Sequence, residues 1–253
     1  MDTHNQYDEN LAEKYEGIVN LGNPAQLLAY ESWLAAIGQL EGVWDADVLD
    51  IGCGTGVSTR LLAEQSPRRI VGLDYSEEML QQAYRRQDLG CQIEYGYADC
   101  SEALDKALHG GFDFVTAMWL FHYADSREML LGFAQSAYSA LRPGGFLVAV
   151  VQDKPEQPKS LPFLGRTGQW IDEPNKNGSR QRISFLDAQG NEVASIVVHV
   201  WGEGTYRECF GKAGFKNIHF TPMCFPRRSR QEIPQWREVE QHMSCCSIMT
   251  ACK

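Results

Sequence analysis

The residues best suited to chemistry are three glycines spaced two apart, directly after a short apolar run. The run over 48–51 is typical of a buried strand; Gly52, Gly54 and Gly56 interrupt it, and apolar residues resume at helical spacing from Val57. Without a Cβ atom, glycine lets the backbone take left-handed dihedrals and approach a ligand, while the next helix offers unpaired N–H groups. We therefore expect a nucleotide-like ligand on this loop.

The spacing of these glycines argues against a dinucleotide. A dinucleotide loop has the form G-x-G-x-x-G, whereas this one is G-x-G-x-G and continues with Val57. Asp50, at the tip of the strand, would repel a pyrophosphate and suits a ligand that carries an amino group or a cation.

Two later strands are followed by acidic residues. The strand expected over 69–74 ends in Asp74, and a carboxylate at this distance from the glycines can accept both hydroxyls of a ribose. Ser76 is the expected N-cap of the next helix, so a capping role for Asp74 is not needed. The strand expected over 91–97 is followed by Asp99.

A fourth strand is expected over 112–118, and it leads into aromatic residues. Ligands of doubly wound sheets bind beyond the carboxyl ends of the parallel strands, so Trp119, His122 and Tyr123 should face that crevice. An apolar helical stripe follows, and the turn 142–145 should end that helix before a fifth strand over 146–151.

Taken in order, these features resemble class I methyltransferases that use S-adenosylmethionine, over roughly residues 45–150. Base-modifying nucleic-acid methyltransferases carry an Asn/Asp-Pro-Pro-aromatic run after the fourth strand, and 117–120 does not match it. The resemblance implies S-adenosylmethionine as the cofactor and assigns cofactor-binding positions to Tyr15, Asp50, Gly52, Cys53, Gly54, Gly56, Asp74, Tyr75, Met79, Ala98, Asp99, Cys100 and Trp119.

The flanks resemble a narrower group, the toxoflavin-synthase-like enzymes that methylate ring nitrogens of azapteridine-type compounds. The shared features are Gln6-Tyr7-Asp8, Phe185-Leu186-Asp187 with Gly190, and a helix bearing Trp236. In such enzymes Tyr7 and Tyr15 belong to a lid over the methionine end of the cofactor; a helix simply packed on the domain is the alternative.

The expected fold is a Rossmann-like seven-stranded α/β sheet, mostly parallel, with helices on both faces, an antiparallel last strand and an inserted β-hairpin. We expect a single domain over 1–253. Its parts are an N-terminal helical lid (1–40), a cofactor-binding core (45–152), a substrate-side insertion (153–203) that is irregular to residue 178 and then forms the hairpin, and a C-terminal helix with edge strands (204–253).

The composition of the chain argues against several kinds of binding partner. With 253 residues, a formal net charge of −10 and a pI near 5.1, the chain lacks the clustered basic charge of a nucleic-acid or anionic-membrane binder. The Arg227–Arg230 segment is expected to be a solvated loop. No apolar run approaches the roughly 20 residues of a membrane span, so a cytoplasmic protein is expected. The eight cysteines form no C-x-x-C, and no metal site is expected.

The expected activity is methyl transfer to a small, flat heteroaromatic metabolite at a ring nitrogen. This is an in-line displacement from an activated donor, driven by positioning, so no obligatory catalytic residue is expected. His122 is the candidate base in the alternative of a small-molecule O-methyltransferase. A non-catalytic adenosyl-binding protein and a nicotinamide oxidoreductase are further alternatives. The acceptor side is assigned to Tyr7, Trp119, His122, Tyr123, Trp170 and Trp201.

Overall fold

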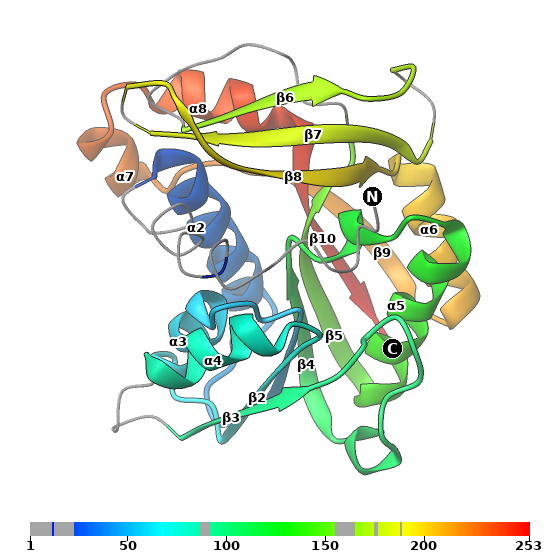
Figure 1. Ribbon diagram of the computed structural model, residues 1–253. Helices are drawn as coiled ribbons and strands as arrows, with labels where there is room; N and C mark the ends of the chain where they lie inside the picture. The colour runs from blue at the N-terminus through cyan, green and yellow to red at the C-terminus, as the bar shows by residue number, and fades with distance from the viewer. Residues whose placement is uncertain (1–11, 13–22, 87–91, 155–164, 175–176, 188) are drawn as a thin grey trace.

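A computed structural model of the chain describes residue 12 and residues 23–86, 92–154, 165–174, 177–187 and 189–253 (Figure 1). The expected lid with Tyr7 and Tyr15 lies outside these residues.

The larger of two sheets has seven strands in the order β3-β2-β1-β4-β5-β10-β9. β1 to β5 pair in parallel, and β10 pairs antiparallel with both β5 and β9, which confirms the mostly parallel sheet with an antiparallel last strand. The strands are β1 Asp47–Ile51, β2 Arg69–Asp74, β3 Ile93–Tyr97, β4 Phe112–Met118, β5 Leu141–Gln152, β9 Lys216–Pro222 and β10 Cys246–Cys252.

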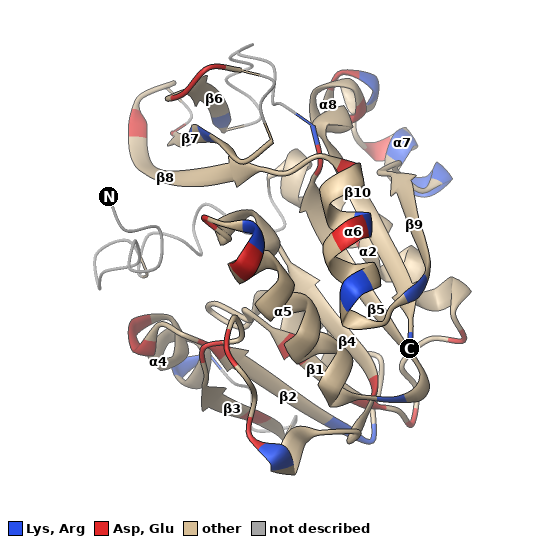
Figure 2. Ribbon diagram, turned by 90° about the vertical axis from the view of Figure 1, so that its right-hand side faces the viewer, with Lys and Arg blue, Asp and Glu red and all other residues tan. Residues whose placement is uncertain are grey.

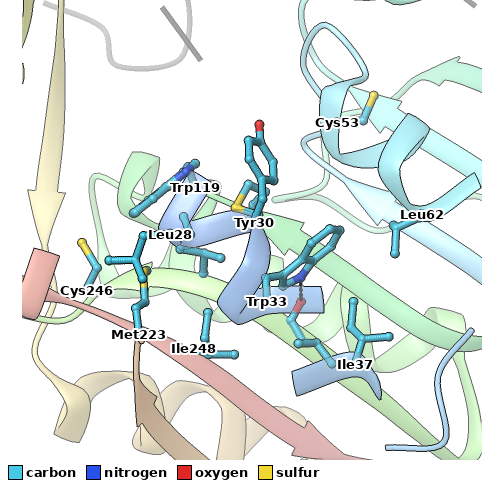
Figure 3. Packing of buried hydrophobic residues seen from close by; sticks show 14 of the residues in the cluster. Leu28, Tyr30, Trp33, Ile37, Cys53, Leu62, Trp119, Met223, Cys246 and Ile248 are labelled. Carbon is cyan, nitrogen blue, oxygen red and sulfur yellow. Dashed lines mark hydrogen bonds between the residues drawn. The ribbon is translucent and has the colours of Figure 1, made fainter. Parts of the chain in front are cut away.

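Helices cover both faces because successive strand residues point to opposite sides. Val48 packs into one core with α2 Pro24–Gln39, α3 Val57–Ala63, α4 Glu77–Arg85 and α8 Trp236–His242. Its neighbour Leu49 packs into the other core with α5 Arg127–Ala140 and α6 Glu203–Ala213. In Figure 3, Trp33 of α2 lies within the first core and its indole N–H donates to the Val148 carbonyl at 3.2 Å.

Ser76 starts its helix as expected, and Ser126 starts the later helix α5 in the same way. The Ser76 hydroxyl accepts the Met79 N–H at 3.2 Å, and the Ser126 hydroxyl accepts the Met129 N–H at 3.3 Å. The cap at Ser76 fixes the start of α4 close to the end of β2, which should carry a ligand-binding group.

α5 ends at Ala140, as the segment 142–145 predicted, but β5 begins earlier than expected, at Leu141, and includes this segment as an irregularity: its pairing with β4 moves from Phe112–Leu141 to Phe114–Phe146. Arg142 explains this extension: its guanidinium bonds the carboxylates of Asp113 at 2.7 Å and Asp47 at 2.5 Å. The start of β5 is thereby tied to β4 and β1, at the edge of the sheet opposite the ligand-binding crevice.

A second, three-stranded antiparallel sheet lies across the carboxyl ends of the parallel strands (Figure 1). Its strands are β6 Arg166–Trp170, β7 Ser179–Leu186 and β8 Glu192–Val200. β7 and β8 confirm the predicted hairpin. The expectation of irregular structure up to residue 178 is wrong for β6, whose sequence Arg-Thr-Gly-Gln-Trp carries little strand signal and pairs only with β7.

Side-chain hydrogen bonds fix this small sheet to the large one. The Gln152 amide, at the end of β5, donates to the Gln181 carbonyl oxygen on β7 at 2.8 Å. The Trp201 indole, just after β8, donates to the Ala124 carbonyl at 2.9 Å. Both bonds are buried, so the small sheet is held in one position above the crevice.

Residues Arg227–Glu232 form the short helix α7, not a loop, and Arg228 pairs with Glu232 at 3.3 Å one turn on. Figure 2 shows this basic helix beside α8. Three short 3₁₀ turns complete the description: Lys106–Leu108, Phe121–Tyr123 and Met243–Cys245. Among the helices of the described residues, none is long and apolar enough to cross a membrane.

A buried carboxylate, Asp50, occupies the centre of the large sheet. Its oxygens accept hydrogen bonds from Ser58 at 2.7 Å and Thr59 at 2.8 Å on α3, and from Thr116 at 2.9 Å on β4. Burial outweighs these three donors and raises the pKa of Asp50 to about 6. The side chain therefore joins β1, β4 and the start of α3 directly beneath the glycine loop.

Asp50→Asn should make folding less sensitive to pH. Because the folded pKa is about 6 and the ordinary value is 3.8, the folded state takes up a proton more readily than the unfolded state, and this stabilisation is lost as pH rises through about 6. A shift of this size corresponds to about 3 kcal/mol at most. Denaturant unfolding from pH 5 to 7.5 should therefore show the variant gaining stability relative to wild type as pH rises.

Asp47→Asn is the matched control. Hydrogen bonding to Arg68 lowers the pKa of Asp47 below its ordinary value, so its titration lies below this pH range. The stability difference between Asp47→Asn and wild type should stay constant from pH 5 to 7.5. The same constancy for Asp50→Asn would contradict a buried carboxylate with a raised pKa.

Candidate functional site

The glycine loop takes its shape from three left-handed residues. Gly52, Gly54 and Gly56 have φ angles of +68°, +55° and +79°, a region that costs other residues about 1–2 kcal/mol. A Cβ atom at Gly52 would lie 2.8 Å from Leu120, and one at Gly56 would lie 2.3 Å from the Tyr95 hydroxyl. The alternating glycines are therefore needed both for the turn and for the close packing around it.

Asp74, at the end of β2, holds this loop through its carboxylate. One oxygen accepts the Gly54 N–H at 2.7 Å, and the other accepts the Ser76 N–H at 2.9 Å. Burial raises the pKa of Asp74, while these backbone donors oppose the rise. Since each carboxylate oxygen can accept two hydrogen bonds, Asp74 keeps capacity for the two hydroxyls of a ribose.

A cleft of about 740 Å³, counting space open to solvent, extends from this loop along the strand ends. Of the predicted cofactor-binding residues, the structure brings nine to it: Gly52, Gly54, Asp74, Tyr75, Met79, Ala98, Asp99, Cys100 and Trp119. Its other lining residues are Ser76, Met118, Leu120, Tyr123, Met129 and Phe133.

Three predicted cofactor residues lie behind the loop and not on the cleft. Asp50 is fully buried, and its carboxylate accepts hydrogen bonds from three hydroxyl groups. It therefore supports the loop from behind and does not meet an amino group of a ligand. Cys53 is buried next to Gly72, where burial raises the pKa of its thiol and keeps it protonated. Gly56 begins α3 above the Tyr95 ring.

Asp99 presents a carboxylate to the far end of the cleft. Its Oδ1 accepts the Ser101 N–H at 2.9 Å and the Ser101 hydroxyl at 2.6 Å. These bonds hold the half-buried side chain through Oδ1 and leave Oδ2 to meet a ligand in the cleft. An exocyclic amino group, such as that of adenine, is a suitable donor to it.

Trp119, the first residue after β4, has a left-handed φ of +62°, which is unusual for a bulky residue. Its backbone N–H donates to the Val150 carbonyl at 3.3 Å, and its indole N–H donates to the Gln26 side chain at 3.3 Å. Figure 3 shows Trp119 at the edge of the packed core near Tyr30. Such strain occurs where surrounding contacts hold a residue in a functional position.

Trp119 and Tyr123 also line a second cavity, of about 320 Å³ counting space open to solvent, beneath the small sheet. Its other lining residues are Gln26, His122, Gln152, Arg166, Ile183, Phe185 and Ile196. The two cavities therefore share an aromatic wall. Trp170 lines neither cavity, and Trp201 is buried and packed on Gly178, so the structure does not bring these two predicted acceptor residues to either cavity.

His122 is buried, and neither ring nitrogen has a hydrogen-bond partner among the described residues. Burial, aided by the positive charge of Arg166, lowers the pKa of His122 to about 3. The imidazole is therefore neutral near pH 7 and is a weak base. It can donate or accept one hydrogen bond in the second cavity.

Sequence reasoning missed the polar residues of the second cavity. Arg166 lies in a stretch that looked irregular, Gln26 is one polar residue among the apolar neighbours at the start of α2, and Gln152 ends a buried strand. No spacing rule connects these positions. The one usable signal was the alternation of Ile183 and Phe185 in β7, which places both on one face. No cluster of potential metal ligands was found in the described part of the chain.

The family comparison agrees with this geometry. A family model described as "Methyltransferase domain" matches residues 48–145, from β1 to the start of β5. A solved structure, an S-adenosylmethionine-dependent methyltransferase from Mesorhizobium loti, has the same fold with a TM-score of 0.61 at 21% identity, over 88% of this chain and 98% of that one.

Two sequence relatives act on different acceptors. Demethylmenaquinone methyltransferase of Lactiplantibacillus plantarum is 27% identical over 85% of this chain and 92% of its own length. The 18S rRNA (guanine(1575)-N(7))-methyltransferase of Saccharomyces cerevisiae is 26% identical over 75% of this chain and 73% of its own. These names agree in the transferred group and differ in the acceptor.

The fold is that of S-adenosylmethionine-dependent methyltransferases. The protein is a methyltransferase with this fold, and its cofactor is S-adenosylmethionine. The cleft suits that molecule: Asp74 has acceptor capacity for the ribose, Asp99 for the adenine amino group, and Met79 with Phe133 offers apolar contact. When bound, the cofactor supplies a methyl group activated by a positively charged sulfur.

Gly56→Ala should weaken the cofactor site through steric overlap as well as strain. The left-handed φ costs about 1–2 kcal/mol, and overpacking against Tyr95 adds about 1–3 kcal/mol. Gly110→Ala is the matched control, because Gly110 has a φ of +62° but no atom within 4 Å of its Cβ position. Thermal unfolding and calorimetry with S-adenosylhomocysteine should show a larger loss for Gly56→Ala.

Combining Gly56→Ala with Tyr95→Phe separates the two causes. Removal of the hydroxyl deletes the atom at 2.3 Å and should recover part of the lost stability and affinity. Equal losses for Gly56→Ala and Gly110→Ala, with no recovery, would mean that Tyr95 does not support the loop.

Asp74→Ala should reduce affinity for S-adenosylmethionine far more than Asp99→Ala. Asp74 has capacity for two ribose hydroxyls and also holds the Gly54 N–H. Charge-assisted hydrogen bonds contribute roughly 1.5–3 kcal/mol each, so a ten- to several-hundredfold loss is expected in calorimetry. Asp187→Ala is the control, because Asp187 accepts the N–H groups of Gln189 and Asn191 in a distant turn. Small, equal effects at Asp74 and Asp99 would contradict this assignment.

Proposed function

We propose that the protein methylates a small, flat heteroaromatic metabolite at a ring nitrogen, with the acceptor held in the second cavity. The observation that carries this proposal is the shared wall of Trp119 and Tyr123, which places a second cavity directly beside the cofactor cleft. Phe185, Ile183 and Ile196 offer apolar contact to the faces of a ring. The net charge of −10 further favours a small acceptor over a nucleic acid.

The properties of His122 support positioning over general-base catalysis. A base works best when its pKa is near the working pH, and the pKa of His122 is lowered to about 3. A ring nitrogen with a lone pair, or one whose proton is already acidic, needs no strong base. His122 then orients the acceptor through a hydrogen bond, and alignment supplies most of the rate enhancement.

The azapteridine-type acceptor expected from the flanking segments is part of this proposal. So are the single-domain organisation and the predicted lid over the cofactor. The alternative is an O-methyltransferase for a small phenol or acid, in which His122 would remove the hydroxyl proton. These two reactions predict different responses to loss of the imidazole.

The test is methyl transfer from labelled S-adenosylmethionine to a panel of azapteridine-type rings and small phenols. His122→Ala should reduce turnover of a ring-nitrogen acceptor within about tenfold, because general-base catalysis would contribute roughly a hundred- to ten-thousandfold. The wild-type pH profile should show no inflection from His122 near pH 6 to 7, since that residue is neutral there.

His199→Ala is the control for removal of a buried imidazole, because His199 packs beside Trp201 and does not line the second cavity. A loss beyond a hundredfold for His122→Ala, partly restored at high pH with intact binding, would favour the O-methyltransferase. Binding of S-adenosylmethionine without transfer to any acceptor of the panel would count against the whole proposal.

A further inference from the structure

His122 lines the second cavity with a side chain whose polar atoms are unpaired. It is 5% exposed, and neither Nδ1 nor Nε2 has a hydrogen-bond partner in the described part of the chain. A buried donor or acceptor that stays unpaired is costly, and such groups are rare in native proteins. This imidazole is therefore suited to a bound molecule that supplies the missing hydrogen bonds.

The imidazole of His122 offers one donor and one acceptor. Burial lowers its pKa to about 3, so near pH 7 one ring nitrogen carries a proton and the other carries a lone pair. The ring centroid lies 6.2 Å from that of Trp119, with 27° between the planes, and 4.6 Å from that of Tyr123 in an edge-to-face contact. These two aromatic contacts restrict the ring beside the wall that the two cavities share.

Gln26, in the first turn of α2, has an amide group whose orientation is fixed by Trp119. The indole N–H donates to Oε1 of Gln26 at 3.3 Å. Because an indole nitrogen can only donate, the oxygen of this carboxamide must face it, and the N–H groups lie on the other side. Gln26 is 4% exposed and lines the second cavity, so Nε2 is a donor for a molecule bound there.

The other carboxamide on the described wall of this cavity, that of Gln152, has a structural role. Its N–H group donates to Gln181 at 2.8 Å and joins the two sheets. Gln26 and His122, in contrast, both lie against Trp119, one at its indole N–H and the other beside its ring. A donor and an acceptor are therefore available at one end of the cavity, next to the cofactor cleft.

We propose that the second cavity recognises an acceptor ring that carries a cyclic amide, in which a carbonyl group lies directly beside a ring N–H. The carbonyl oxygen accepts a hydrogen bond from the amide of Gln26, and the ring N–H donates to the unprotonated nitrogen of His122. This inference rests on the proposed function, which assigns the second cavity to the acceptor. It narrows the acceptor from any flat heteroaromatic ring to one that contains a lactam or an imide.

Two planar bicyclic probes of nearly equal shape test recognition of the ring N–H. In 2-quinolinone the carbonyl lies beside a ring N–H, and in coumarin it lies beside a ring oxygen. Each is titrated by calorimetry into the full chain saturated with S-adenosylhomocysteine. 2-Quinolinone should bind at least about tenfold more tightly, because coumarin has no donor for the unprotonated nitrogen of His122. Equal affinity for the two probes, or tighter binding of coumarin, would overturn the inference.

Two substitutions separate the two hydrogen bonds. His122→Phe keeps an aromatic ring and removes both nitrogens, so the two probes should then bind within about threefold of each other. Gln26→Met removes the donor to the carbonyl that both probes carry, so it should weaken both by about threefold to tenfold and keep their ratio. A full preference for 2-quinolinone in His122→Phe, or unchanged affinity for both probes in Gln26→Met, would show that the inference is wrong.

His199→Phe is the matched control, because His199 is a buried imidazole that does not line the second cavity. It should keep the wild-type preference for 2-quinolinone. The comparison of the two probes on the wild-type protein decides the question even where a variant does not fold.

Thermal stabilisation by S-adenosylhomocysteine separates this inference from the proposed function. If that ligand gives no stabilisation, the proposed function fails at the cofactor step. If it stabilises the protein but neither probe binds, the assignment of the acceptor to the second cavity fails, and the inference fails with it. If both probes bind with equal affinity, a flat heteroaromatic acceptor in this cavity stands, and only the cyclic amide is excluded.

Discussion

The hydrogen bond from the Gly54 N–H to the Asp74 carboxylate, at 2.7 Å, is the contact on which the cofactor cleft depends. It joins the loop after β1 to the end of β2, and the neighbouring bond from the Cys53 N–H to the Leu73 carbonyl strengthens the same connection. The Ser76 N–H on the other oxygen adds the start of α4. One carboxylate thus fixes three segments before any ligand arrives, which lowers the entropic cost of binding.

A second constraint acts at Trp119, where β4 leaves the sheet. Its left-handed backbone is unfavourable for a tryptophan, yet contacts with Val150, Gln26 and Arg166 hold it from three directions. This conformation turns the ring into the border between the cofactor cleft and the second cavity. The strain is offset by packing and hydrogen bonds that come from β5, α2 and β6, so the border exists only in the complete fold.

Local rules were sufficient for the parts of the fold that depend on neighbours in sequence. The apolar strands β1, β2 and β4, the cap Ser76 and the glycine turn followed from residue pattern and spacing. β6 did not, because its sequence Arg-Thr-Gly-Gln-Trp becomes a strand only through pairing with β7. Whether these residues form a strand depends on tertiary pairing, which a single sequence does not show.

The residues of the site also divide into those that the sequence could predict and those that it could not. Asp74 and Asp99 were predictable because a parallel sheet brings its strand ends together, whatever the side chains elsewhere. Asp50 looked equally suitable, but the hydroxyls of Ser58, Thr59 and Thr116 enclose it. Arg166 and Gln26 reach the second cavity from segments about 140 residues apart, and only the folded chain shows that they meet.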